Sequence, residues 1–271
     1  MTIANNNTSS TWQLADTVIN SRLLIGTALY PSIAIMKQAI IASQAEVITV
    51  SIRRQNPVSL GGNAFWNEVQ SLNKKLLPNT AGCHSAKEAI TTALMAREIF
   101  STHWVKLEVI GNDHTLQPDP FALLEAAREL ISQGFEVFPY CTDDLILCEK
   151  LVQAGCRILM PWASPIGSGK GLLNPYALQN LRRAFPSVNL IVDAGIGKPS
   201  HAAQALEMGY DGLLLNTAVA RSADPVMMAN AFRQAVSAGH LAAKAGLMVE
   251  QESGSPSTPV VGKPFWHQAD N

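Results

Sequence analysis

Eight short apolar runs, separated by longer amphipathic segments, make up most of this chain. The runs are rich in leucine, isoleucine and valine and have the length of β-strands. Their alternation with segments of helical character predicts a repeated strand and helix unit. The runs are Arg22–Thr27, Val47–Ile52, Leu76–Asn79, Trp104–Gly111, Glu136–Cys141, Arg157–Ala163, Asn189–Gly195 and Gly212–Ala218.

The segments between the runs contain signals for helix starts and ends. Ser85 with Glu88 forms a capping box, and Asp119–Pro120 and Asp224–Pro225 each combine an N-cap residue with proline in the first turn. Glycine favours the left-handed conformation that follows many helices. The glycines expected to end helices are Gly134, Gly155, Gly209 and Gly239.

Several runs are apolar at nearly every position, which indicates parallel strands covered by helices on both faces. Eight such units in roughly 220 residues suit a closed barrel. We therefore predict an α/β fold, a single (β/α)8 TIM barrel, with a doubly wound open sheet as the structural alternative. The chain has 271 residues, 47% of them hydrophobic and 15% charged, which is enough for one core of this size.

Three parts are expected along the chain. A polar N-terminal extension covers residues 1–21, the barrel covers 22–248, and a Ser/Pro/Gly-rich tail covers 249–271. Within the barrel, residues 53–75 are predicted to form a long connection after the second strand, because they contain glycine and asparagine.

Charge and targeting signals narrow the class of partner and the compartment. The net charge is −1, and no cluster of lysine and arginine forms the basic surface that a nucleic-acid or anionic-membrane binder needs. The N-terminus lacks the basic start and apolar stretch of a secretory signal, and no apolar run is long enough to span a bilayer. We expect a cytoplasmic protein that acts on small molecules or other proteins.

Neither the cysteines nor the histidines suggest a metal site. The six histidines show no ligand spacing, and the cysteines show no C-x-x-C pair. The cysteines lie in apolar stretches, so we expect small buried side chains without disulfides or metal. They are Cys83, Cys141, Cys148 and Cys156.

The fourth run places two charged residues on its inward face. By the two-residue period of a strand, Lys106 and Glu108 share one face, roughly 7 Å apart along the strand, while Val105, Leu107 and Val109 share the other. One interpretation is a structural ion pair. The other is catalytic: burial disfavours the ammonium form of lysine, the neutral amine attacks a ketone to form an imine, and the glutamate moves protons.

Further polar and glycine-rich groups follow the last strands, at the end where barrels carry their active sites. Asp193 interrupts the seventh run, either as a core acid bonded to backbone N–H groups or as a second acid/base. The loops that begin at Ser164, Ala194 and Asn216 expose backbone that is able to bind phosphate, although each is also explained by a tight turn.

These motifs, taken in order, resemble the bacterial thiazole synthase family from about Ser21 to Met248. The resemblance rests on SRLLIGT, VITVSIRR, LLPNTAG, KLEVIG, LQPDP, SPIGSG, NPYAL, IVDAGIG and GLLLNTAVA. Other phosphate-binding barrels share single pieces but not this series. The resemblance implies a Schiff-base enzyme of thiamine biosynthesis.

That resemblance implies a reaction of 1-deoxy-D-xylulose 5-phosphate, dehydroglycine and sulfur from the C-terminal thiocarboxylate of a ubiquitin-like carrier protein, without cofactor or metal. It also implies a homo-oligomer, a tetramer. By the family's motifs, Lys106 forms the imine, and Glu108 and Asp193 act as acid and base. The implied sugar-phosphate contacts are Gly167, Ala194, Gly195, Asn216 and Thr217.

The sequence departs from the family pattern at two places near the expected reacting face. Ala28-Leu29 stands where Gly-Lys is expected, and Trp162 stands where smaller residues are common. Two other functions stay open: a class I aldolase-type enzyme, which uses a buried lysine without a sulfur carrier, and a phosphate-binding barrel without catalysis. Turnover without the carrier, or ligand binding without adduct formation, distinguishes them.

Overall fold

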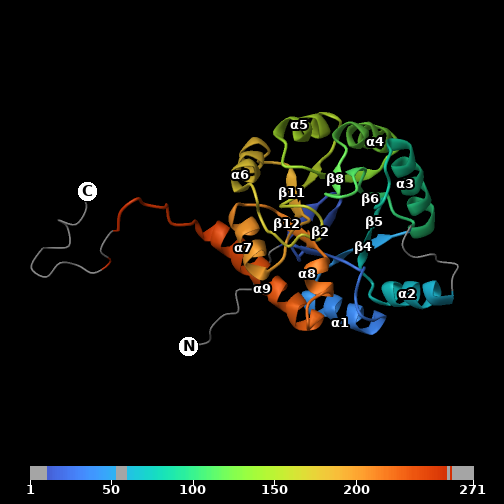
Figure 1. The fold of residues 1–271 in the computed structure, drawn as a ribbon, viewed down its shortest axis with the longest axis horizontal. Helices are drawn as coiled ribbons and strands as arrows, with labels where there is room; N and C mark the ends of the chain where they lie inside the picture. The colour runs from blue at the N-terminus through green and yellow to red at the C-terminus, as the bar shows by residue number, and fades with distance from the viewer. Residues whose placement is uncertain (1–10, 53–59, 255–256, 258–271) are drawn as a thin grey trace, which may run out of the picture.

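A computed structural model, which describes residues 11–52, 60–254 and 257, shows a closed barrel of parallel strands inside a ring of helices (Figure 1). All eight predicted strands form. The last of them along the chain pairs with the first, and this pairing closes the sheet into a barrel. The (β/α)8 prediction is confirmed and the open-sheet alternative is wrong. The barrel strands are β3 (Leu23–Gly26), β4 (Val47–Ser51), β5 (Lys75–Asn79), β6 (Trp104–Leu107), β9 (Glu136–Cys141), β10 (Ile158–Pro161), β11 (Asn189–Asp193) and β12 (Gly212–Leu215).

The helices cover the outer face of this sheet and bury its outward side chains. They are α1 (Ile33–Ser43), α2 (Leu60–Ser71), α3 (Ala86–Phe100), α4 (Pro120–Ser132), α5 (Leu145–Gln153), α6 (Pro175–Ala184), α7 (Pro199–Glu207), α8 (Thr217–Ala220) and α9 (Pro225–Ala245). None of the helices in the described parts of the chain is long and apolar enough to cross a membrane.

The predicted helix caps form, with one exception at a glycine. Ser85 accepts a hydrogen bond from Glu88 N, and Asp119 and Asp224 cap α4 and α9. Gly239, however, lies inside α9 and does not end it. A Cβ atom at this position would lie 2.4 Å from the carbonyl oxygen of Ala203 in α7, so the glycine allows the two helices to approach closely. Gly134, Gly155 and Gly209 follow helices with positive φ as expected.

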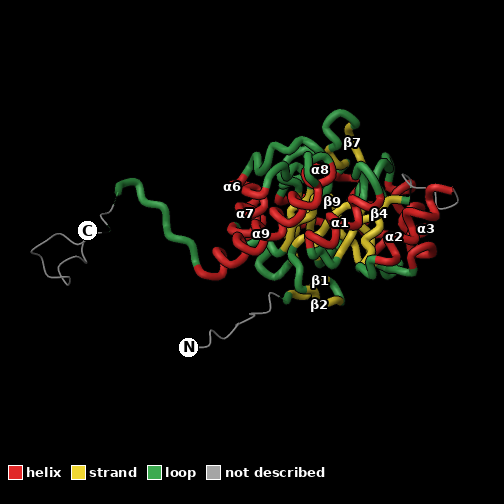
Figure 2. Tube along the Cα trace, turned by 90° about the horizontal axis from the view of Figure 1, so that it is seen from below, coloured by secondary structure: helices red, strands yellow, loops and turns green. Residues whose placement is uncertain are grey.

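A short hairpin closes the N-terminal end of the barrel. It comprises β1 (Trp12–Leu14) and β2 (Thr17–Ile19), in a segment that was expected to be a polar extension. Trp12, Leu14 and Ile19 are buried and pack against inward side chains of the barrel such as Trp104. Figure 2 shows this hairpin at the opposite end of the barrel from β7. The first ten residues of the predicted extension, and most of the predicted tail, lie outside the described residues.

The fourth barrel strand is shorter than predicted. It ends at Leu107. The Thr80 hydroxyl accepts a hydrogen bond from Glu108 N and donates one to Glu108 O, and these two bonds replace the backbone hydrogen bonds that Glu108 would make to neighbouring strands. The chain then forms an outer hairpin of β7 (Ile110–Asn112) and β8 (Gln117–Pro118). The segment 53–75 also differs from its prediction as a long connection, because it contains the helix α2.

The cysteines behave as predicted for small buried side chains. All four are free, and the Sγ atoms of Cys141 and Cys148 lie 3.9 Å apart, well beyond the length of a disulfide bond. Burial raises the pKa of the Cys156 thiol to about 12, so this side chain is a poor nucleophile near neutral pH.

Candidate active site

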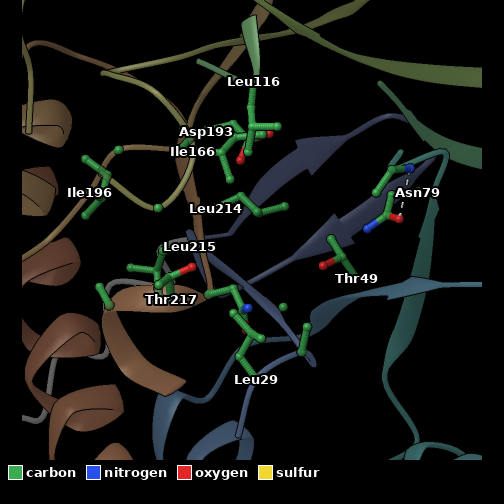
Figure 3. A pocket seen from close by; sticks show the side chains of 18 of the residues that line it. Leu29, Thr49, Asn79, Leu116, Ile166, Asp193, Ile196, Leu214, Leu215 and Thr217 are labelled. Atoms are coloured by element: carbon green, nitrogen blue, oxygen red, sulfur yellow. Dashed lines mark hydrogen bonds between the residues drawn. The ribbon is translucent and has the colours of Figure 1, made fainter. Parts of the chain in front are cut away.

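A cavity of about 950 Å³ opens at the C-terminal ends of the barrel strands (Figure 3). The closed sheet brings the ends of distant segments to one place, which is why residues far apart in the sequence share this space. All eight residues predicted from the sequence line it. They are Lys106, Glu108, Gly167, Asp193, Ala194, Gly195, Asn216 and Thr217.

Three charged side chains form a buried cluster inside the cavity. The Lys106 Nζ atom lies 3.1 Å from Glu108 Oε1 and 2.6 Å from Asp193 Oδ2. All three residues are at most 6% exposed. The strand period places Lys106 on the inward face with Trp104, and β11 brings Asp193 to it from elsewhere on the barrel wall. The predicted pairing of Lys106 with Glu108 is therefore present, with Asp193 as a second partner.

The expectation that burial makes Lys106 easier to deprotonate is wrong. Burial lowers the pKa of Lys106, but the negative charges of Asp193 and Glu108 outweigh burial and hold the pKa above its ordinary value. Burial also raises the pKa of Asp193, because Lys106 does not fully offset burial and the charge of Glu108. One ammonium and two carboxylates leave a negative charge in a water-poor site, so the cluster favours taking up a proton.

This arrangement suits proton transfer between an amine and its neighbours. A lysine ammonium becomes a nucleophile only after it loses a proton, and Asp193 Oδ2 lies within hydrogen-bond distance to accept it. The carboxylate with the raised pKa is thus placed where a proton must go when Lys106 attacks a carbonyl carbon.

The loops after β10 and β11 present glycine backbone to the cavity. Gly167 has φ +74° and no heavy atom within 4 Å of an added Cβ, whereas a Cβ at Gly195 would lie 1.9 Å from Ser164 Oγ. Ala194 and Gly195 both have positive φ. A glycine at 195 is therefore required for packing of the two loops, while the space beside Gly167 is open to a ligand.

The third predicted phosphate contact lies after β12. The carbonyl oxygen of Asn216 accepts hydrogen bonds from Val219 N and Ala220 N at the start of α8. The Asn216 side chain forms no cap, and its Oδ1 atom is buried without a hydrogen bond to any described residue. It packs beside Gly26, where an added Cβ would lie 2.7 Å from Asn216 Cβ. Asn216 thus offers a free amide group at the cavity wall.

Polar residues that were not predicted from the sequence also line the cavity. Ser51 and Asn79 line it from the ends of β4 and β5, and Arg221 lines it after α8. A polar residue at the last position of an apolar strand was the available signal for Ser51 and Asn79. Arg221 follows Thr217 by about one helical turn.

The two departures from the family pattern lie in different environments. Leu29 lines the cavity mouth with φ +69° and 52% exposure, while Trp162 donates from Nε1 to Asp143 Oδ1 at 2.9 Å and is not among the described cavity residues. The loop lysines Lys170 and Lys198 are likewise absent from the described lining. Of Lys106, Lys170 and Lys198, the described cavity lining includes Lys106 alone.

Comparison with known proteins agrees with this geometry. The family model described as "Thiazole biosynthesis protein ThiG" matches residues 13–259. The thiazole synthase of Bradyrhizobium sp. (strain ORS 278) is 61% identical over 252 residues, covering 93% of this chain and 97% of that protein. The thiazole synthase of Brucella anthropi is 58% identical over 245 residues, with 90% and 96% covered.

A solved structure shows the same likeness. A chain in the crystal structure of the Amycolatopsis orientalis BexX/CysO complex superposes with a TM-score of 0.80 and 31% identity, covering 89% of this chain and 98% of that chain. Fold and site define a (β/α)8-barrel enzyme with a buried amine between two carboxylates in its mouth. The chain belongs to the thiazole synthase family of thiamine biosynthesis.

Proposed function

We propose that this chain forms the thiazole phosphate carboxylate precursor of thiamine, in the cytoplasm, with Lys106 as the amine that holds the sugar. The substrates are 1-deoxy-D-xylulose 5-phosphate, dehydroglycine and the thiocarboxylate sulfur of a carrier protein. The observation that carries this proposal is the contact of Lys106 Nζ with two buried carboxylates inside a cavity large enough for several reactants.

Each member of the cluster has a role in the proposed reaction. Lys106 transfers a proton to Asp193, attacks the C2 ketone and forms an imine as water leaves. Removal of a proton from C3 then gives an enaminol, and return of a proton to C2 leaves a ketone at C3 that accepts sulfur. Glu108 and Asp193 lie within 3.1 Å of the nitrogen and supply the acceptors and donors for these steps.

We place the sugar phosphate at the loops after β10, β11 and β12. Gly167, Ala194 and Gly195 present backbone with positive φ there, and Asn216 and Thr217 lie at the start of the next helix. Backbone N–H groups in such loops are able to bind phosphate without a close cationic side chain. Arg221 at the cavity wall adds one positive charge on the same side.

An omission assay tests the function. The full chain is incubated with the sugar phosphate, a source of dehydroglycine and a thiocarboxylated carrier, and the product is followed by mass spectrometry. Formation of the thiazole that requires all three inputs supports the proposal. Cleavage of a carbon–carbon bond without carrier would instead favour a class I aldolase, and binding without an adduct would favour a barrel without catalysis.

Substitution of Gly167 with alanine is expected to raise the KM for the sugar phosphate severalfold while kcat stays nearly unchanged. The added methyl meets no protein atom, so it occupies space that we assign to the phosphate. Steady-state kinetics with varied sugar measure the effect. Gly246→Ala is the matched control, because Gly246 also has positive φ and open space but follows α9 outside the cavity. An equal KM in both variants would place the phosphate elsewhere.

We propose that a small ubiquitin-like carrier docks over the barrel mouth, with its C-terminal tail directed at the imine. The CysO partner in the BexX complex supports a protein partner for this fold. A narrow, flexible tail suits an opening at the C-terminal ends of the strands, since the thiocarboxylate must reach the carbon above Lys106.

We also propose that the chain assembles into a homotetramer, in line with the family resemblance.

Leu29→Asp is expected to weaken carrier binding by about tenfold, because it places a charge on an exposed apolar residue at the mouth. The backbone tolerates this change, since aspartate adopts the left-handed conformation of Leu29 more readily than leucine does. Val18→Asp is the control, as Val18 is similarly exposed at the closed end of the barrel. Calorimetry that gave equal losses for both variants would refute docking at the mouth.

A further inference from the structure

Three polar residues form a row across neighbouring strands on one side of the cavity. In the parallel register Ser51 of β4 lies beside Asn79 of β5, and Asn79 lies beside Lys106 of β6. All three line the cavity. In the order of the barrel, β4 and β5 lie across from β10 and β11, two of the three strands whose loops we assign to the phosphate. The row therefore runs from the reacting amine along the wall that faces the β10 and β11 loops.

The Asn79 side chain is held in one orientation by the backbone. Its Oδ1 atom accepts a hydrogen bond from Ala81 N at 3.3 Å, which assigns the other position to the amide nitrogen. Figure 3 shows this bond and the remaining arm of the amide directed toward the cavity interior. Nδ2 has no hydrogen bond to another described residue, so its two donors are available to a ligand.

Ser51 provides a second available group beside it. Its Oγ atom is buried and forms no hydrogen bond within the described part of the chain. A buried hydroxyl without a partner is unfavourable, and buried polar groups of this kind usually have one. The two side chains together offer neutral donors next to Lys106, where a small polar ligand would satisfy both.

The charge of the cavity limits which anion binds near the amine. The charged residues of the lining are Lys106 and Arg221 against Glu108, Asp113 and Asp193, so the described lining carries more negative than positive charge. The two carboxylates therefore repel a second anionic substrate unless hydrogen-bond donors offset that repulsion. Ser51 and Asn79 are uncharged donors of this kind, on strands other than those that carry Glu108 and Asp193.

We propose that Ser51 and Asn79 bind the carboxylate of the second substrate, a two-carbon α-imino acid. Bound there, the carboxylate accepts hydrogen bonds from Asn79 Nδ2 and Ser51 Oγ, and the imine carbon is directed toward the sugar adduct on Lys106. This inference rests on the proposed function and adds to it a place for the reactant that carries no phosphate. It divides the cavity into a phosphate side and a carboxylate side, with the amine between them.

Two substitutions at Asn79 separate ligand binding from loop support. Asn79→Asp keeps the acceptor for Ala81 N but replaces the donor with a negative charge, whereas Asn79→Ala removes both groups without adding charge. If Asn79 binds a carboxylate, the KM for the imino acid rises about tenfold for alanine and further for aspartate. If Asn79 only supports the loop, alanine is the more harmful change. Ser51→Ala is expected to raise the same KM by a smaller factor.

The assay uses the full chain with saturating sugar phosphate and thiocarboxylated carrier, and varies glyoxylate with ammonium as the source of imino acid. Borohydride trapping on Lys106, measured at equilibrium over a range of sugar concentrations, reports the sugar independently. The sugar concentration that gives half-maximal trapping is expected to stay within about twofold of the value for the unmodified chain in all Asn79 variants. Asn174→Asp, the same change at an exposed helix cap outside the cavity, is the control and is expected to behave as the unmodified chain.

The outcomes distinguish this inference from the function on which it rests. Normal trapping with an unchanged imino-acid KM in Asn79→Asp overturns the carboxylate subsite alone. A higher sugar concentration at half-maximal trapping shows that the row binds the sugar instead, and this result also overturns the carboxylate subsite. Failure of the unmodified chain to trap sugar on Lys106 overturns the proposed function itself.

Discussion

Replacement of Lys106 with arginine is expected to abolish both sugar trapping and thiazole formation while the barrel stays folded. Arginine keeps the positive charge that Glu108 and Asp193 need, because the guanidinium does not lose its proton in a protein, but for the same reason it is not a nucleophile. Borohydride reduction with the sugar phosphate should add one sugar mass to the unmodified chain, on the peptide that contains Lys106, and none to the variant.

Lys170→Arg and Lys198→Arg are the matched controls, since both lysines belong to loops near the mouth but are not among the described residues of the cavity lining. They should trap sugar normally. Circular dichroism of the Lys106→Arg protein checks that the fold survives. An adduct on either loop lysine, or retained turnover after loss of Lys106, would contradict the proposed mechanism.

The second large effect concerns the two carboxylates. Glu108→Gln and Asp193→Asn should each lower turnover on the order of a hundredfold, as expected when a general acid or base is removed. Sugar trapping should persist. Removing a negative charge next to an ammonium makes the ammonium less stable, so the raised pKa of Lys106 should fall in the Asp193→Asn protein and more of the amine should be neutral near pH 7.

Single-turnover assays and trapping, measured in parallel over a range of pH, separate these two effects. The trapping rate of the unmodified chain should increase with pH, because the Lys106 pKa is raised, and the increase should begin at lower pH in Asp193→Asn. Glu136→Gln is the control, as Glu136 is a buried acid at the other end of a barrel strand, paired with Arg157. Near-normal turnover in both amide variants would remove these residues from the mechanism.

The barrel was predictable because its strands are apolar on both faces and its helices have local caps. The inward direction of Lys106 and Glu108 followed from the two-residue period alone. The β1 and β2 hairpin was missed because three-residue strands leave too short a pattern, and its burial depends on side chains such as Trp104 that come from far along the chain.

The protonation of the lysine could not be predicted from its own segment. Burial of Lys106 was visible in the sequence, and burial alone lowers the pKa of an amine. The opposing effect depends on the 2.6 Å contact with Asp193, which is set by barrel closure and not by any local motif. The availability of Ser51 and Asn79 likewise depends on which hydrogen bonds remain unmade after folding.

The hairpin at the bottom of the barrel has a kinetic consequence. Because β1 and β2 cover the N-terminal end with buried apolar side chains, the described residues leave the cavity open at the C-terminal end of the barrel. In the proposed reaction, the sugar phosphate therefore has to enter before the docked carrier tail covers that opening. The finished ring then leaves only after the tail withdraws. The proposed docking thus predicts a compulsory binding order, with the dissociation rate of the carrier as an upper limit on the steady-state rate.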